Sequence, residues 1–231
     1  HLRALDAVNP EDEGLEDAVS GGVTAIIATP GSENVIGGQS VALKTRGRTV
    51  DEMILRQPAG LKIAFGENPV KIHGGKDRPP STRMTVAGII RENLVAAGEY
   101  IKKGPRAGRD LRLEALAAVL KGHIPLRAHA HAADDIMTAL RIAAEFDLQL
   151  TIEHATAGHK IADILAARGI PAAVGPSITA RVKVELRDRT YRTPAILHAA
   201  GVKVALITDH PFLPIGGLRL EAALALKEGL P

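Results

Sequence analysis

Three short apolar runs, each leading to side chains that can bind a metal ion, most constrain the fold of this chain. The first run leads to His129 and His131, the second to His154, and the third to Asp209. Sequence with helical spacing separates the runs, so we expect them to be parallel strands. The carboxyl ends of such strands meet on one side of a sheet, which would bring these side chains into one site.

The composition indicates one large globular domain that covers residues 1–231. Hydrophobic residues make up 45% of the chain and charged residues 24%, which suits a substantial core. Aromatic residues make up only 2%, so aliphatic side chains must fill that core. The chain has no cysteine, which excludes disulfides and thiolate ligands. A metal site must therefore use histidine and carboxylate groups.

The charge distribution argues against nucleic-acid and membrane partners. The formal net charge is +3, but lysine and arginine are scattered among acidic residues. A basic stripe with interleaved aromatic residues, which is typical of nucleic-acid binding, is missing from the sequence. No apolar run approaches the roughly 18 to 20 residues of a spanning helix. We expect a soluble protein, and the lack of cysteine is typical of a reducing cytoplasm.

The first part of the chain predicts a mixture of helices and strands. Apolar spacing and turn residues predict helices at 15–20 and 50–56, strands at 23–28 and 61–65, and a weak strand at 41–43. A long loop rich in Gly, Pro and Lys is expected at 70–83. Such a loop is either a substrate-side lid or a surface excursion.

The second part of the chain alternates regularly between helix and strand. The pattern predicts strands at 126–130, 150–154, 172–174 and 203–208, and helices at 85–102, 111–120, 133–146, 159–168, 192–200 and 217–228. Repeated units of this kind predict an α/β fold with a parallel sheet, either an open doubly wound sheet or a (β/α)8 barrel. Seven strands can be counted where a barrel needs eight, and His1 is not an initiator Met. We expect the missing first strand upstream of His1.

The quoted runs resemble the metal-dependent amidohydrolase superfamily, and most closely the imidazolonepropionase-related amidohydrolases. The resemblance is carried by the runs Leu-Arg-Ala-His-Ala-His, which ends at His131, Thr-Ile-Glu-His, which ends at His154, and Val-Ala-Leu-Ile-Thr-Asp-His-Pro, which contains Asp209. It implies a TIM-type (β/α)8 barrel with a small β-sandwich built from both chain ends. It also implies hydrolysis of amide or other C–N bonds in a small-molecule substrate by a metal-bound hydroxide.

The resemblance assigns roles to individual residues. His129 and His154 correspond to metal ligands, and Asp209 corresponds to a general base that also contacts the metal. A carboxylated lysine or a glutamate bridges two metals in many members, and the candidates here are Lys62 and Glu67. We prefer Glu67, because it follows its strand in a Gly-Glu-Asn-Pro turn from which it can reach the cavity. The expected metal is Zn²⁺, with Fe or Mn as alternatives.

Three further residues are candidates for substrate binding. His131 and His210 adjoin the proposed metal-binding elements, and Arg83 follows the predicted long loop. Imidazole groups can bind an oxyanion, and a guanidinium group can pair with a substrate carboxylate.

One departure from the family pattern concerns the first barrel strand. That strand carries a His-x-His pair in the family, and no such pair precedes residue 129 here. The sandwich strands are missing as well. We therefore expect a fragment of a larger amidohydrolase that holds a partial metal site and has uncertain activity of its own.

Two alternatives from other classes remain at this stage. A metal-free barrel enzyme could bind phosphate at Gly216 and Gly217, before the last predicted helix. A catalytically inactive barrel fragment could instead associate with a second copy, which would cover the open edge of its sheet.

Overall fold

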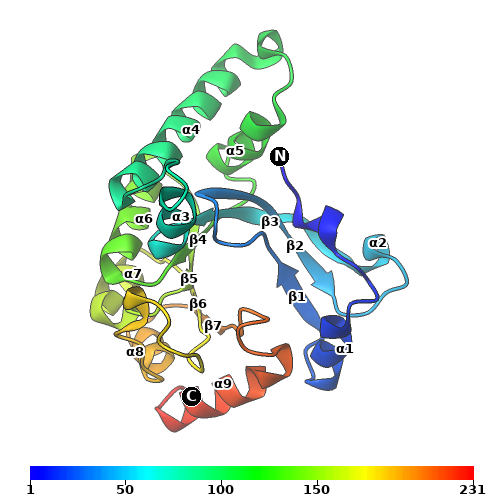
Figure 1. The fold of residues 1–231 in the computed structure, drawn as a ribbon, viewed down its shortest axis with the longest axis vertical. Helices are drawn as coiled ribbons and strands as arrows, with labels where there is room; N and C mark the ends of the chain where they lie inside the picture. Colours follow the sequence, from blue (N-terminus) through cyan, green and yellow to red (C-terminus); the bar gives the residue numbers. More distant parts are fainter.

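A curved sheet with helices packed along its outer side forms the framework of the molecule (Figure 1). A computed structural model describes residues 1–231, apart from the side chain of Ala107. These residues form one sheet of seven strands in the order β1-β2-β3-β4-β5-β6-β7. The strands are β1 (Ala25–Ala28), β2 (Ile36–Lys44), β3 (Ile54–Ala64), β4 (Leu126–Ala130), β5 (Leu150–His154), β6 (Ala172–Val174) and β7 (Val204–Leu206).

Several of the helices begin at a residue whose side chain caps the first turn. They are α1 (Glu13–Ser20), α2 (Val50–Met53), α3 (Glu67–Gly74), α4 (Arg83–Lys103), α5 (Leu111–Leu120), α6 (Ala133–Glu145), α7 (Ala162–Ala167), α8 (Thr193–Ala199) and α9 (Leu218–Lys227). The Asp12 side chain accepts a hydrogen bond at the start of α1, Thr82 does so for α4 and Asp110 for α5. Each cap satisfies backbone N–H groups that the first helical turn leaves without partners.

The parallel part of the sheet confirms the βα pattern of the second half of the chain. Strands β3 to β7 all pair in parallel. In the register, Ala64 lies opposite His129, His129 opposite Glu153, and His154 opposite Val174. The carboxyl ends of β4 and β5 are therefore level with each other, as the sequence predicted.

The prediction of a wholly parallel sheet is wrong for the first two strands. Strand β1 pairs with β2 in antiparallel fashion, and β2 pairs with β3 in the same way. The connection between β1 and β2 comprises only residues 29–35. A parallel connection needs a crossover of a dozen or more residues, so this short link permits only an antiparallel pair.

Three predicted boundaries in this region also differ from the structure. The weak strand at 41–43 is part of the longer β2, and the helix predicted at 50–56 ends at Met53, where β3 follows directly. Pro58 lies at a bulge inside β3. Arg56 pairs with Ala42 and Gly60 pairs with Ser40, so β3 has more residues than β2 between these two pairs. Proline is tolerated at such a bulge because it has no N–H to donate to the ladder. The loop predicted at 70–83 is shorter, because α3 extends to residue 74.

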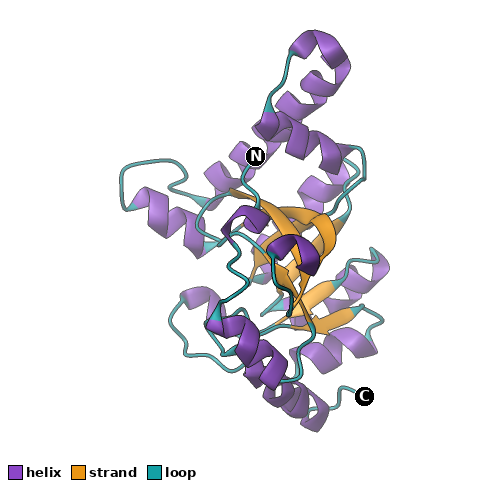
Figure 2. Ribbon diagram, turned by 90° about the vertical axis from the view of Figure 1, so that its right-hand side faces the viewer, coloured by secondary structure: helices purple, strands orange, loops and turns teal.

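The sheet is strongly curled and forms part of a barrel (Figures 1 and 2). Within the described residues, the two outer strands β1 and β7 are not paired with each other. The larger core cluster packs β3 to β6 against the helices and includes Leu126, Ile152 and Leu140. A smaller cluster of Leu15, Val41, Leu43 and Met53 joins α1 and α2 to the antiparallel strands.

None of the described helices is both long enough and apolar enough to span a membrane.

Burial in the larger core predicts a clear difference between two leucines on helices. Leu140 on α6 is 2% exposed, whereas Leu226 on α9 is 63% exposed. We expect Leu140→Ala to lower the free energy of unfolding by about 2–5 kcal/mol, because it removes buried methyl groups and leaves a cavity. Leu226→Ala should change it by about 0.5 kcal/mol or less. Urea denaturation of both variants measures the difference, and equal losses would contradict the assigned core.

Candidate metal centre

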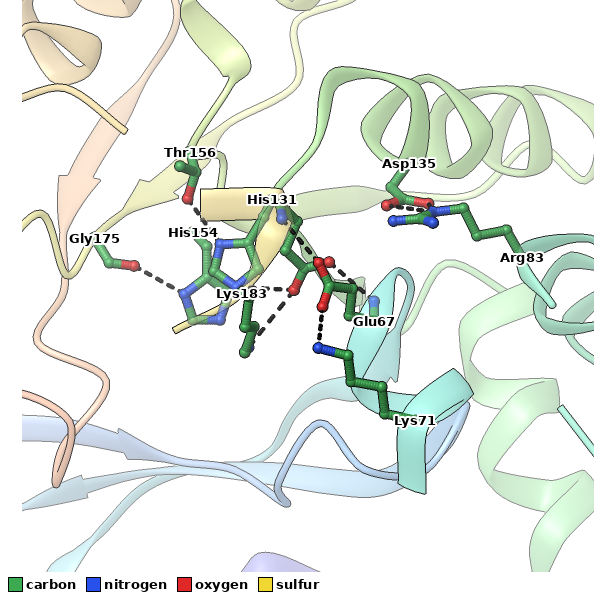
Figure 3. A network of polar contacts seen from close by, with 10 residues as sticks. Glu67, Lys71, Arg83, His131, Asp135, His154, Thr156, Gly175 and Lys183 are labelled. Atoms are coloured by element: carbon green, nitrogen blue, oxygen red, sulfur yellow. Dashed lines mark hydrogen bonds and ion pairs between the residues drawn. The ribbon is translucent and has the colours of Figure 1, made fainter. Parts of the chain in front are cut away.

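Three histidines from two neighbouring strands meet at the carboxyl ends of β4 and β5, and Figure 3 shows two of them, His131 and His154. His129 lies in β4, His131 follows its end, and His154 is the last residue of β5. The ring centroids of His129 and His131 are 4.7 Å apart, those of His129 and His154 4.4 Å, and those of His131 and His154 4.5 Å. One nitrogen from each ring lies within 4.8 Å of the others, and all three residues are buried. This histidine cluster can hold one metal ion.

A local change of backbone conformation brings His154 into the cluster. Glu153 lies opposite His129 in the register, so its side chain shares the face of the sheet that His129 occupies. The next residue of a regular strand would point to the other face. His154 instead has φ of 73° and Ala155 has φ of 46°, which are left-handed conformations rarely adopted outside glycine. The turn at the end of β5 therefore directs the His154 ring back toward His129.

Hydrogen bonds to Nδ1 orient two of the three rings. His154 Nδ1 donates to the carbonyl oxygen of Gly175 at 2.8 Å, since a carbonyl can only accept. The lone pair of His154 is therefore on Nε2 and free to bind a metal. His131 Nδ1 lies 2.7 Å from Thr156 Oγ1, a bond in which either atom can be the donor.

His129 differs from its two neighbours because neither ring nitrogen has a hydrogen-bond partner in the described part of the chain. The residue is only 2% exposed. A buried polar group without a partner costs roughly 1–3 kcal/mol. A metal ion bound through one of these nitrogens would remove that cost, so the residues present fit a metal.

The environment keeps the three imidazoles neutral. Burial lowers the pKa of His129 and His131 well below the ordinary value, and the charges of neighbouring histidines and of Lys62 and Lys183 act in the same direction. Burial also lowers the pKa of His154, although the negative charge of Asp209 opposes this effect. Neutral imidazole is the form that binds metal ions.

A buried network of three charges lies against the cluster on the same face of the sheet. Glu153 forms ion pairs with Lys62 of β3 and with Arg127 of β4, the latter at 2.6 Å. Burial opposes ionisation of Glu153, but the two cations outweigh it and lower its pKa. Lys62 lies beside the histidine cluster, with its ammonium group engaged by Glu153.

The predicted bridging residue Glu67 is held at the start of α3. Its Oε1 accepts a hydrogen bond from the backbone N–H of Glu185 at 2.9 Å, and its other oxygen pairs with Lys71. Burial tends to raise the pKa of Glu67, but Lys71 and the Glu185 N–H together lower it. Among the described residues, Glu67 and Asp209 lie outside the compact group that the three histidines form.

The remaining predicted site residues occupy separate positions. Asp209 follows β7, is partly buried and has φ of 48°. Arg83 Nε donates to both carboxylate oxygens of Asp135, at 3.0 and 3.1 Å. His210 is exposed, and its ring lies against Gly14 near the start of α1.

Sequence reasoning missed several residues that surround the histidines. Arg127 is two residues before His129 on the same strand, so the two-residue alternation of a strand could have indicated it. Glu153 could have been inferred in the same way once the register of β4 and β5 was known. Glu185 lies in the long segment between β6 and α8, where no periodic pattern marks it.

Comparisons with known proteins bear on the fold and on the site. No family model matches the chain. A crystal structure from Thermotoga maritima MSB8 superimposes with a TM-score of 0.97 at 45% sequence identity, and the match covers 100% of this chain and 62% of that one. The protein tasK of Hapsidospora irregularis is 28% identical over 260 residues, which cover 99% of this chain and 26% of that protein. Both relatives are named amidohydrolases.

These likenesses support the amidohydrolase resemblance drawn from the motifs. The structural match to the Thermotoga chain covers the whole of this chain, including the curled sheet. The chain spans about a quarter of the length of the fungal relative and less than two thirds of the Thermotoga chain.

The buried charge network predicts a large effect of one substitution on stability. Glu153→Gln would leave Lys62 and Arg127 without a negative partner in the interior. We expect the free energy of unfolding to fall by about 3–5 kcal/mol, which is typical when one member of a buried ion pair is removed. Glu145 pairs with Arg91 at the surface, and Glu145→Gln should cost about 1 kcal/mol or less. Chemical denaturation distinguishes the two, and a small loss for Glu153→Gln would contradict the network.

The lowered histidine pKa values predict that the metal-free chain becomes less stable as the pH falls. Below the ordinary pKa of 6.5, imidazoles of the unfolded chain bind protons that the buried ones resist. The unfolded state then binds more protons, so the free energy of unfolding decreases from about pH 7.5 to about pH 5.5. His129→Asn should weaken this dependence, whereas the exposed His198→Asn should leave it unchanged. Urea titrations in the presence of a chelator test this, and identical pH slopes for the parent and His129→Asn would refute it.

Proposed function

We propose that this chain carries the metal centre of a hydrolase that cleaves amide or other C–N bonds. The observation that carries the proposal is the cluster of three buried, neutral histidines in which His129 has no hydrogen-bond partner among the described residues. The two amidohydrolases that resemble the chain support the class of reaction.

The donor set suits a first-row divalent metal. Imidazole nitrogen, with carboxylate oxygen nearby, favours Zn²⁺, and Fe or Mn are the alternatives. His129 and His154 would be ligands, and His131 presents a third imidazole to the same space, beyond the substrate-binding role first considered for it. When bound, such an ion acidifies a water molecule and polarises a carbonyl group.

Asp209 is the proposed general base. It follows the last strand, and its negative charge opposes the lowering of the pKa of His154. In the proposed reaction the carboxylate accepts a proton from the attacking water and then gives it to the leaving nitrogen. His154, fixed by Gly175, and His129, fixed by β4, would hold the reacting centre beside it.

The bridging role is assigned to Glu67 in preference to Lys62. Lys62 Nζ is an ammonium donor to Glu153 and cannot bind a metal in that form. Glu67 presents an ionised carboxylate at the carboxyl end of β3. Its contacts with Lys71 and the Glu185 N–H would have to rearrange for it to bind a metal.

Substrate contacts are proposed for Arg83 and His210. The Arg83 side chain is half exposed although Asp135 anchors its Nε, so the rest of its guanidinium group can pair with a carboxylate. His210 adjoins Asp209 in the segment after β7.

Packing explains one of the two glycines of the phosphate-binding alternative. A Cβ atom at Gly217 would lie 3.0 Å from Leu213 Cγ, which accounts for this glycine without an anion. A Cβ atom at Gly216 would make only ordinary contacts, at 3.9 Å, although Gly216 packs so closely against Gly21 that Gly21 has no room for a side chain.

Metal analysis tests the proposed centre. We expect the purified chain, reconstituted with Zn²⁺ and dialysed, to retain about one ion per chain. His154→Ala and Asp209→Ala should lower this content, and His154→Ala should also abolish hydrolysis in a screen of amide substrates. His198→Ala, which changes an exposed histidine, is the matched control and should behave like the parent. A parent chain that retains no metal would overturn the proposal, and one that binds metal without hydrolysing any amide would favour an inactive chain.

A further inference from the structure

Glu185, in the segment between β6 and α8, is a buried carboxylate beside His131 of the histidine cluster. Its side chain is 1% exposed. Oε1 lies 3.8 Å from His131 Nε2 and 3.6 Å from Lys183 Nζ. No hydrogen bond to this oxygen is found among the described residues. A buried carboxylate oxygen normally accepts a hydrogen bond, so the missing bond needs an explanation.

The other oxygen of Glu185 is fixed by a reciprocal contact with Glu67. Glu185 Oε2 accepts from the Glu67 backbone N–H at 2.9 Å, and the Glu185 N–H donates to Glu67 Oε1 at the same distance. Gly66 allows this approach, because a Cβ atom there would lie 2.4 Å from Glu185 Oε2. The pair of bonds holds the side chain rigidly, with Oε1 left toward the cluster.

Apart from Asp209, the carboxylates beside the cluster are already committed to other groups. Glu153 uses one oxygen for Lys62 and the other for Arg127. Glu67 uses one oxygen for the Glu185 N–H and the other for Lys71. Three neutral imidazoles provide no negative charge, and a divalent cation taken out of water needs some. Glu185 Oε1 is placed to provide that charge on the His131 side.

Lys183 places a positive charge beside Glu185 Oε1. Its side chain is 19% exposed and comes from the same segment as Glu185, so its ammonium group can move toward solvent. The positive charge of Lys183 also contributes to the low pKa values of His129 and His131, which shows that it acts on the cluster. A divalent cation held by the histidines would repel it.

We propose that Glu185 binds, through Oε1, the divalent cation held by the histidine cluster. In the absence of the cation, Lys183 forms an ion pair with this carboxylate, and the cation displaces it. The inference rests on the proposed metal centre and adds a ligand that lies outside the sequence motifs. The 3.8 Å between Glu185 Oε1 and His131 Nε2 is a separation that two ligands of one ion can have. The two residues therefore have opposite effects on cation affinity.

The test measures the affinity of the chain for Zn²⁺ by competition with a chelator, and records the visible absorption of the Co²⁺ form. Glu185→Gln should weaken Zn²⁺ binding by about tenfold or more and change the Co²⁺ spectrum, because a charged oxygen donor is lost. Lys183→Met should tighten binding by about threefold or more, because the competing charge is removed.

A matched control is available on α9, which supports the same segment. Glu221 is also buried, and its Oε1 accepts hydrogen bonds from the backbone N–H groups of Ser177 and Ile178. Glu221→Gln therefore tests the loss of a buried carboxylate that supports this segment without facing the histidines. It should leave the Zn²⁺ affinity and the Co²⁺ spectrum unchanged, and circular dichroism checks that each variant is folded.

The possible results separate this inference from the proposed function. Failure of the parent chain to bind metal would overturn the metal centre itself. Metal binding by the parent with an unchanged affinity in Glu185→Gln would overturn only the role of Glu185. If Glu185→Gln does not fold, Lys183→Met decides, and unchanged or weaker binding by that variant would overturn the inference.

Discussion

The parallel pairing of β4 with β5 is the interaction on which the site depends. It places Glu153 opposite His129 and His154 opposite Ala130, so that strand hydrogen bonds set the spacing of the histidine rings. A shift of the register by one residue would turn these side chains to the other face of the sheet. The buried charges of Lys62, Arg127 and Glu153 reinforce the pairing across three adjacent strands, because they can be satisfied only in this register.

Much of the second half of the fold could be predicted from the sequence, whereas in the first half the full extent of β2 and β3 and the helix α3 could not. Strands β4, β5 and β6 were located at their observed bounds because short apolar runs alternate there with helical spacing. In the first half, Gly37, Gly38 and Pro58 obscure two long strands, because a bulge accommodates residues that normally interrupt a sheet. The connection between β1 and β2 is too short for a parallel pair, and its length could be read from the sequence. The prediction gave more weight to the parallel pattern of the later strands.

The candidate site was predicted to a similar extent. His129 and His154 were found because strand ends in an α/β fold collect polar side chains, and the structure brings them together. His131 lies beside them because it comes two residues after His129, and side chains two residues apart on a strand point to the same face. The hydrogen bonds between Glu185 and Glu67 could not be foreseen, since they join residues more than a hundred positions apart and no periodic pattern marks the short 3-10 helix Val184–Leu186. The backbone turn at His154 was also hidden, because no glycine marks a left-handed conformation there.

The burial of three imidazoles has a consequence for the choice of metal. Nitrogen donors of this kind bind Cu²⁺ more tightly than Zn²⁺, and Zn²⁺ more tightly than Mn²⁺, whatever reaction the protein carries out. If the cluster holds a metal as proposed, ligands that are fixed by the sheet would impose one geometry on the bound ion, and geometry is one of the means by which such a site can favour an ion other than Cu²⁺. The other means is availability, so the metal recovered with the protein would reflect the growth medium as well as the sequence.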